Sequence, residues 1–313
     1  MSDDRANGSS SPEDAPGPTP ALVLGRGPFW LPQANGLPDV LSVVGPWTRR
    51  LTSQWEDAGR PGIYYKSVAT DTLSFLADLE GLPSFSSYGP ITTDLGIECR
   101  PELAHLGLNS VCSEARDLSA FAKLVSLGGP DRCHRGFESL VSLRRLAMPR
   151  WQSRDCERLS VLRGLRELRF YQSAKLESLA GLEQLPEMRE LSVGYSRRLC
   201  DVSVLSSANL RSLEIISFRP ELDLSFVTRL PNLQILRLEN CPRIASLQPL
   251  SGHPTLKIAS LSGTSTVLDG DMSPLLTIPN LELMGYTNRK HYSHKEDSIR
   301  AQLSKHPRDL NVD

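Results

Sequence analysis

Four short blocks, LRELRF (165–170), MRELSV (188–193), LRSLEI (210–215) and LQILRL (233–238), share one pattern of apolar residues. In each block the first apolar residue is followed three positions later by a leucine, and two positions after that by another apolar residue. Counted from Leu146, the central leucines are separated by 22, 23, 22 and 23 residues. A fixed period of this length indicates stacked structural repeats.

The same pattern continues on both sides of these blocks. Its central positions are residues 106, 127, 146, 168, 191, 213, 236, 259 and 284, with one short interval of 19 residues before 146 and one long interval of 25 before 284. The segment GIYYKS at 62–67 predicts an earlier strand, because Ile63 precedes Phe85 by 22 residues and Phe85 precedes Leu106 by 21. We therefore expect repeats from residue 62, best formed from about residue 103.

Each motif predicts a β-strand whose alternate side chains face opposite sides. Leu168 and Phe170 should point inward, whereas Glu167, Arg169 and Tyr171 should point outward. The spacers carry an apolar residue at every third position, which is typical of a 3₁₀ return, and prolines at 186, 231, 254 and 279 close the returns. Closely stacked strands beside wider returns should bend into a horseshoe with the strands on its concave face.

This pattern resembles the leucine-rich repeat family, in particular its 22-residue class as in bacterial internalin-like proteins. The resemblance implies an α/β solenoid with parallel strands on the concave face, 3₁₀ or irregular helical returns on the convex face and a cap at each end. One family feature is not kept, because a continuous asparagine ladder is absent. The asparagine position is taken by Val111, Arg132, Trp151, Ser173, Ser196, Phe218, Cys241, Thr264 and Arg289.

Outside the repeats the composition changes. Residues 1–20 have no large apolar residue after Met1, which predicts a disordered tail. Residues 21–61 hold three of the four tryptophans, which predicts an N-terminal cap, with a partner-binding aromatic cluster as the alternative. After the solenoid at 62–290, residues 291–313 predict a C-terminal capping helix that begins at Asp297 or Ser298 and presents Ile299 and Leu303 on one face.

The net charge and the absence of targeting signals limit the expected class of partner and the expected compartment. The net charge of −1 disfavours broad electrostatic binding of nucleic acid or an anionic membrane. No secretory signal or long apolar run is visible, so we expect a cytoplasmic protein with no nucleic-acid or membrane partner. Arginine outnumbers lysine heavily, which is typical of a GC-rich bacterial genome.

No residue pattern favours catalysis, a cofactor or a metal. The six cysteines form no CxxC pair and several are spaced by whole repeats, so we interpret them as free thiols inside repeats. His291 and His294 lack further ligands, and Cys133–His134 lacks an identifiable triad partner. An enzyme with a catalytic domain in residues 21–100 is a third, disfavoured hypothesis, and a nucleic-acid role is favoured less still.

The outward residues of the central strands carry the functional prediction. They combine both signs of charge with an aromatic ring and two isoleucines, a mixture that favours a protein interface over a merely solvated face. We predict a non-enzymatic scaffold that binds an unidentified protein; the alternative is an inhibitor or immunity protein against a toxin or enzyme encoded beside it. The predicted contact residues are Arg145, Glu167, Arg169, Tyr171, Glu190, Glu214, Ile216, Ile235, Arg237 and Glu239.

Overall fold

The computed structural model of the chain describes residues 23–26, 39–67, 71–89, 91–93, 95–108, 116–130, 134–207 and 209–303. The expected tail at 1–20, the aromatic pair Phe29 and Trp30, Cys133 and residues 304–313 lie outside these ranges.

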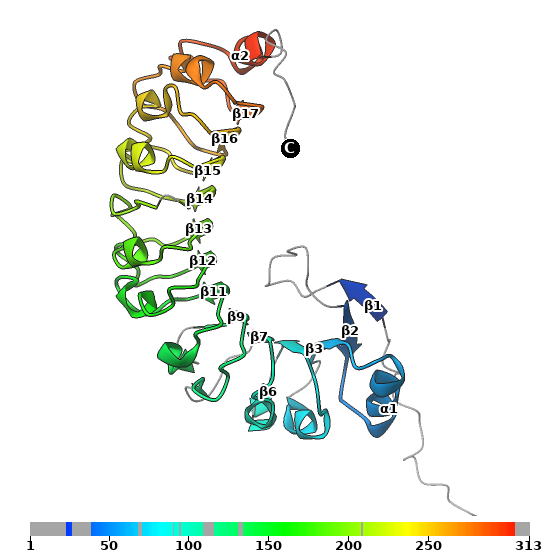
Figure 1. Cartoon of the computed structure of the whole chain (residues 1–313). Helices are drawn as coiled ribbons and strands as arrows, with labels where there is room; N and C mark the ends of the chain where they lie inside the picture. Colours follow the sequence, from blue (N-terminus) through cyan, green and yellow to red (C-terminus); the bar gives the residue numbers. More distant parts are fainter. Residues whose placement is uncertain are drawn as a thin grey trace, which may run out of the picture.

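A thirteen-stranded sheet forms the inner layer of the molecule, and its strands follow one another in chain order (Figure 1). All neighbours pair in parallel except β1 and β2, which are antiparallel. The strands are β1 (Val23–Arg26), β2 (Asp39–Val44), β3 (Gly62–Lys66), β5 (Ser84–Tyr88), β7 (His105–Leu108), β9 (Ser126–Gly128), β11 (Arg145–Pro149), β12 (Glu167–Tyr171), β13 (Glu190–Gly194), β14 (Ser212–Ile216), β15 (Ile235–Glu239), β16 (Ile258–Ser262) and β17 (Leu283–Tyr286).

The register of the sheet keeps the central leucines in one row. Leu168 is paired with Leu146 on one side and Leu191 on the other, and the row continues through Leu213 and Leu236. These side chains are at most 2% exposed, so the row is the inner edge of a continuous core. Burial of each leucine contributes about 1.5–3 kcal/mol to the free energy of unfolding, a gain that requires the neighbouring repeat.

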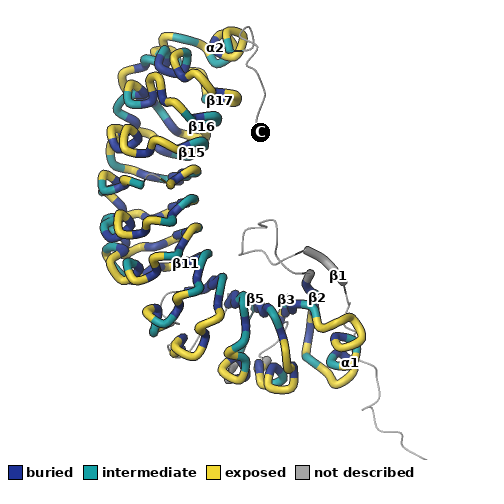
Figure 2. Tube along the Cα trace, in the orientation of Figure 1, coloured by how far each residue is buried: buried dark blue, intermediate teal, exposed yellow. Residues whose placement is uncertain are grey.

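Short 3₁₀ helices form the returns, as the period of three predicts. In the return after β12, Leu182 donates its N–H to the carbonyl of Leu179, and Leu185 donates to that of Leu182, each at 3.1 Å. All three leucines are buried. Figure 2 shows buried and exposed residues interleaved along the returns of the array. The returns contain η1 (Ser74–Asp78), η2 (Leu95–Cys99), η4 (Phe137–Ser139), η5 (Glu157–Leu159), η6 (Leu182–Gln184), η7 (Ser225–Arg229), η8 (Gln248–Leu250) and η9 (Ser273–Thr277), and two-stranded pairings join β4 (Asp71–Thr72) to β6 (Ile91–Thr93) and β8 (Arg116–Asp117) to β10 (His134–Arg135).

The array turns sharply near β9, so that two arms face each other across the concave side (Figure 1). The outward residues at the middle of the strands are small at this bend: Gly107, Gly128 and Ala147 occupy one row of the register. Small side chains leave room where the inner faces of neighbouring repeats approach most closely. The fold is therefore a leucine-rich repeat solenoid with a bend between its N-terminal and central repeats.

Packed aromatic rings and a helix lie at the N-terminal end of the array. Helix α1 (Arg49–Asp57) buries Trp55, whose indole N–H donates to the carbonyl of Pro61 at 2.7 Å. Trp47 stacks on Phe75 with ring centroids 4.6 Å apart. These two tryptophans are therefore occupied by intramolecular packing.

A second helix, α2 (Glu296–Leu303), lies at the opposite end of the array beyond β17 (Figure 1). Ile299 is fully buried and Leu303 packs against the same core. The helix begins at Glu296, slightly earlier than the Asp297 or Ser298 that the sequence indicated. Its apolar face is turned toward the last repeat.

The turns after the strands replace asparagine by hydroxyl and thiol groups. The N–H of Trp151 donates to Ser173 Oγ at 3.1 Å, and the N–H of Cys241 donates to Ser265 Oγ at 3.0 Å. The sequence pattern placed Thr264 at the asparagine position of the turn after β16. This prediction is wrong, because Thr264 is exposed whereas Ser265 is buried. One extra residue after β16 shifts the pattern, and Gly263 adopts a φ of 66° there.

Candidate partner-binding face

The central strands place all ten predicted contact residues on the side of the sheet opposite the buried leucines. In β12, Glu167, Arg169 and Tyr171 are half-buried, whereas Leu168 and Phe170 between them are fully buried. The parallel register repeats this alternation from β11 to β15. We call the ten residues the concave ladder: Arg145, Glu167, Arg169, Tyr171, Glu190, Glu214, Ile216, Ile235, Arg237 and Glu239.

The ladder differs from the sequence-based expectation at its isoleucines. Ile216 is only 9% exposed, because Gly194 on the neighbouring strand leaves space for it. Ile235 is half-buried and is paired with Ser212, so the two isoleucines lie at opposite ends of adjacent strands. The two outward isoleucines therefore do not form one apolar patch.

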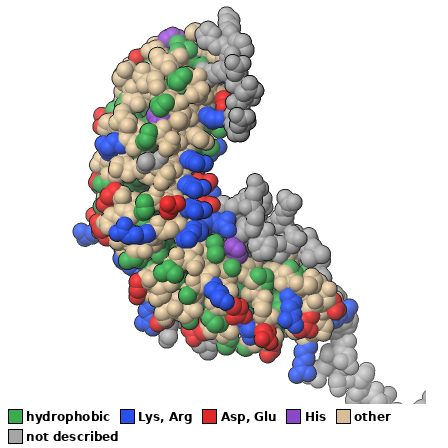
Figure 3. Space-filling view, viewed as in Figure 1, with side chains coloured by type: hydrophobic (Ala, Val, Ile, Leu, Met, Phe, Trp, Pro, Cys, Tyr) green, Lys and Arg blue, Asp and Glu red, His purple; other side chains and the backbone are tan. Residues whose placement is uncertain are grey.

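Opposite charges lie side by side on the ladder without forming ion pairs. Arg145 is the register partner of Glu167, and Glu214 is the register partner of Arg237. Within the described part of the chain, no two ladder charges come within 4.0 Å, whereas other ion pairs such as Arg243–Glu221 at 2.8 Å lie outside the ladder. Figure 3 shows basic and acidic side chains along the inner edge of the sheet. Cross-strand pairing therefore does not account for these charges.

Burial and neighbouring charges disturb the titration of two groups near the bend. Burial, followed by the negative charge of Glu190, raises the pKa of Glu167, and Arg145 and Arg169 oppose this rise. Burial, followed by the positive charge of Arg145, lowers the pKa of His105 to about 4. Buried Glu167 Oε2, Arg145 Nε and His105 Nδ1 have no hydrogen-bond partner. Such groups carry an energetic cost that a partner can relieve if the side chains rearrange.

A chain of hydrogen bonds crosses three repeats in the middle of the ladder. The hydroxyls of Tyr171 and Ser192 are 3.1 Å apart, and Ser192 donates to Glu214 Oε2 at 2.6 Å. Because Ser192 uses its proton toward Glu214, Tyr171 is the donor in the first bond. The chain holds the Tyr171 ring over Gly194, where the Cβ of any larger residue would lie 3.2 Å from ring carbons. The ladder is therefore ordered before any partner binds.

An apolar strip continues the surface beyond the charges, and the sequence-based prediction omitted most of it. Ile235, Ile258 and Leu283 are register partners on β15, β16 and β17. Leu283 is 53% exposed, although the two isoleucines are half-buried. The sequence did indicate this strip, because each of the three residues immediately precedes the central residue of its motif. The charged ladder therefore borders an apolar strip on the same face of the sheet.

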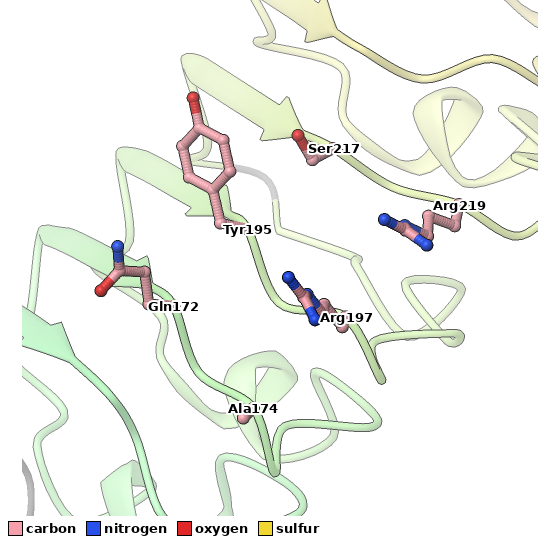
Figure 4. Close-up of a pocket in the computed structure, with 6 residues that line it drawn as sticks. All are labelled: Gln172, Ala174, Tyr195, Arg197, Ser217 and Arg219. Atoms are coloured by element: carbon pink, nitrogen blue, oxygen red, sulfur yellow. The ribbon is translucent and has the colours of Figure 1, made fainter.

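A pocket of about 450 Å³ opens where β12, β13 and β14 end (Figure 4). It is lined by Gln172, Ala174, Tyr195, Arg197, Ser217 and Arg219. None of these residues is among the contacts predicted from the sequence. The two arginines occupy equivalent positions, three residues beyond Gly194 and Ile216 at the ends of β13 and β14. This 22-residue spacing was the signal that could have identified them.

The histidines and cysteines outside the ladder and the pocket form no reactive cluster in the described part of the chain. His291 Nε2 lies 2.9 Å from the carbonyl of Val267, and His294 Nδ1 lies 2.9 Å from Ser293 Oγ. Cys156 and Cys241 are buried, and burial raises the pKa of the Cys241 thiol to about 11. Cys99 and Cys200 are free and exposed, and both lie in returns of the repeats. In the described ranges, no group of three or more potential ligands could hold a metal ion.

Comparison with known proteins identifies similar folds only. No family model and no curated protein matches the chain. Among solved structures, it is similar to an internalin (inlF) from Listeria monocytogenes, with 20% identity, coverage of 67% of each chain and a TM-score of 0.47. Internalin C2 from the same organism has 18% identity, coverage of 68% of this chain and 84% of that chain, and a TM-score of 0.49. A leucine-rich repeat protein from Leptospira interrogans has 14% identity, coverage of 72% of each chain and a TM-score of 0.37.

The repeat geometry by itself defines the fold class of the protein. The chain has the fold of a leucine-rich repeat protein, with parallel strands stacked in chain order and their central leucines in register. Over the described residues, the structure contains no helix that is long and apolar enough to cross a membrane.

Proposed function

We propose that the chain is a non-enzymatic interaction scaffold that binds a protein through the concave ladder and the adjoining apolar strip. One observation carries this proposal: Glu214 and Arg237 are neighbours in the register and are not ion-paired. Arg237 is exposed on the surface and Glu214 accepts a hydrogen bond from Ser192. Charges held apart in this way remain available to complementary charges on a partner.

The composition of the face supports a protein partner. Arg169, Arg237 and Tyr171 belong to the residue types that dominate protein interfaces, and Leu283 supplies exposed apolar area beside them. The ladder also carries Glu167, Glu190, Glu214 and Glu239, which would repel phosphate backbones. A partner with mixed charges and an apolar edge fits this surface best.

Charge reversal tests the proposal. The full chain and its Arg169→Glu/Arg237→Glu variant would be used to capture proteins from extracts of the source organism, followed by mass spectrometry. The matched control is Arg198→Glu/Arg243→Glu, which makes the same charge change at arginines already paired with Glu177 and Glu221 outside the ladder. We expect the control to retain a captured protein that the ladder variant loses, with an unchanged Tm for the ladder variant. Equal capture by both variants would refute binding through the ladder.

A further inference from the structure

The pocket at the ends of β12, β13 and β14 has the composition of an anion site. Figure 4 shows the guanidinium groups of Arg197 and Arg219 facing the same space, with Ser217 and Tyr195 beside them. Both arginines are exposed and lie at equivalent positions of adjacent repeats. Within the described ranges, neither has an acidic side chain within 4.0 Å. Two unpaired cations held next to each other repel, and an anion between them would remove that repulsion.

The backbone explains why these side chains converge. Gln172, Tyr195 and Ser217 each adopt a left-handed conformation, with φ of 53°, 56° and 61°. Their N–H groups are used by the fold, since each donates to the carbonyl at the end of the next strand at 2.7–3.1 Å. The side chains that line the pocket offer it two guanidinium groups, two hydroxyls and one amide as donors.

The number of donors and the space favour a phosphate group over a carboxylate. A carboxylate has two oxygens, whereas a phosphate monoester presents three acceptor oxygens and nearly two negative charges. Guanidinium groups bind both anions in bidentate geometry, but two of them match the larger charge of the phosphate. The volume of about 450 Å³ also leaves room for the organic part of an ester.

Tyr195 supplies the surface for that organic part. Its ring is 50% exposed and lines the pocket together with the two arginines (Figure 4). We propose that Arg197 and Arg219 bind a phosphate monoester whose organic substituent rests on Tyr195. This pocket is separate from the concave ladder, so the proposal stands or falls independently of the proposed function.

Isothermal titration calorimetry at constant ionic strength would test the proposal with phenyl phosphate, inorganic phosphate and acetate. The proteins are the full chain, Arg197→Gln/Arg219→Gln, and the charge-matched control Arg198→Gln/Arg243→Gln. We expect saturable binding of phenyl phosphate to the full chain and the control, and at least about tenfold weaker binding to the pocket variant. The arginines are exposed, so the pocket variant should keep the Tm of the full chain.

The other ligands and a Tyr195 variant decide which class of ligand the pocket binds. Inorganic phosphate should bind more weakly than phenyl phosphate, and Tyr195→Ala should remove the difference. Equal binding of acetate and phosphate would overturn the preference for phosphate, and equal binding of inorganic and phenyl phosphate would overturn the monoester assignment. Absence of saturable binding to the full chain, or equal binding to both arginine variants, would overturn the site itself.

Discussion

Ser192 donates a hydrogen bond of 2.6 Å to Glu214 on the next strand, while Tyr171 on the preceding strand lies 3.1 Å from the same hydroxyl. One small side chain thus connects three repeats on the concave face. Ser192 is only 7% exposed, so water competes little for these bonds. The connection fixes the middle of the ladder in a single arrangement, which reduces the ordering cost of binding.

Removal of this hydroxyl should destabilise the solenoid. We expect Ser192→Ala to lower the free energy of unfolding by about 1–2 kcal/mol, because Glu214 loses a donor and Tyr171 loses its acceptor. Urea unfolding of Ser192→Ala, Tyr171→Phe and the double variant would measure the coupling. The double variant should cost less than the sum of the single variants, and full additivity would show that the two hydroxyls act independently.

The turn after β16 offers a matched pair of substitutions, at buried Ser265 and exposed Thr264. Ser265 Oγ accepts from the N–H of Cys241 at 3.0 Å and donates to the carbonyl of Leu238 at 2.9 Å, both in buried surroundings. Ser265→Ala should therefore cost about 1–3 kcal/mol. Thr264→Ala, at the exposed neighbouring position, should stay within about 0.5 kcal/mol of the unsubstituted protein. Chemical denaturation distinguishes them, and a larger loss for Thr264→Ala would restore the assignment made from the sequence.

His105 should titrate well below the ordinary range of histidine. Burial and then Arg145 lower its pKa from 6.5 to about 4, so the fold disfavours the protonated form. The unfolded chain binds the extra proton between these two values, and the contribution of His105 to stability therefore falls as pH decreases from 6.5 toward 4. An NMR titration of the ring protons would give a midpoint near 4. Arg145→Gln should raise that midpoint, and an unperturbed midpoint near 6.5 in the unsubstituted protein would show that His105 is solvated.

The core of the solenoid was predictable because its signal is periodic. Leu168 and Phe170 alternate with polar residues in every block, and their inward position follows from strand geometry alone. The ladder followed from the same alternation, since an outward register position needs only the strand assignment. Periodicity therefore determined which face each residue occupies, but not how exposed it is.

The features that the sequence did not predict depend on interactions between repeats. Ile216 is buried because Gly194 lies beside it, and this depends on the pairing of two strands. The pocket depends on left-handed turns at Gln172, Tyr195 and Ser217, residue types that do not signal positive φ. Stacking imposes that conformation on them. The arginine pair was thus hidden by a turn geometry that the local sequence does not reveal.

Photo-cross-linking would test the central claim most directly, with a photoreactive amino acid at one surface position of the full chain at a time. Arg237 is exposed on the concave ladder, whereas Val141, 74% exposed, lies in the return between η4 and β11. Irradiation in extracts of the source organism should give a discrete cross-linked protein from position 237 and none from position 141. A discrete product from position 141 with none from position 237 would contradict binding through the concave face.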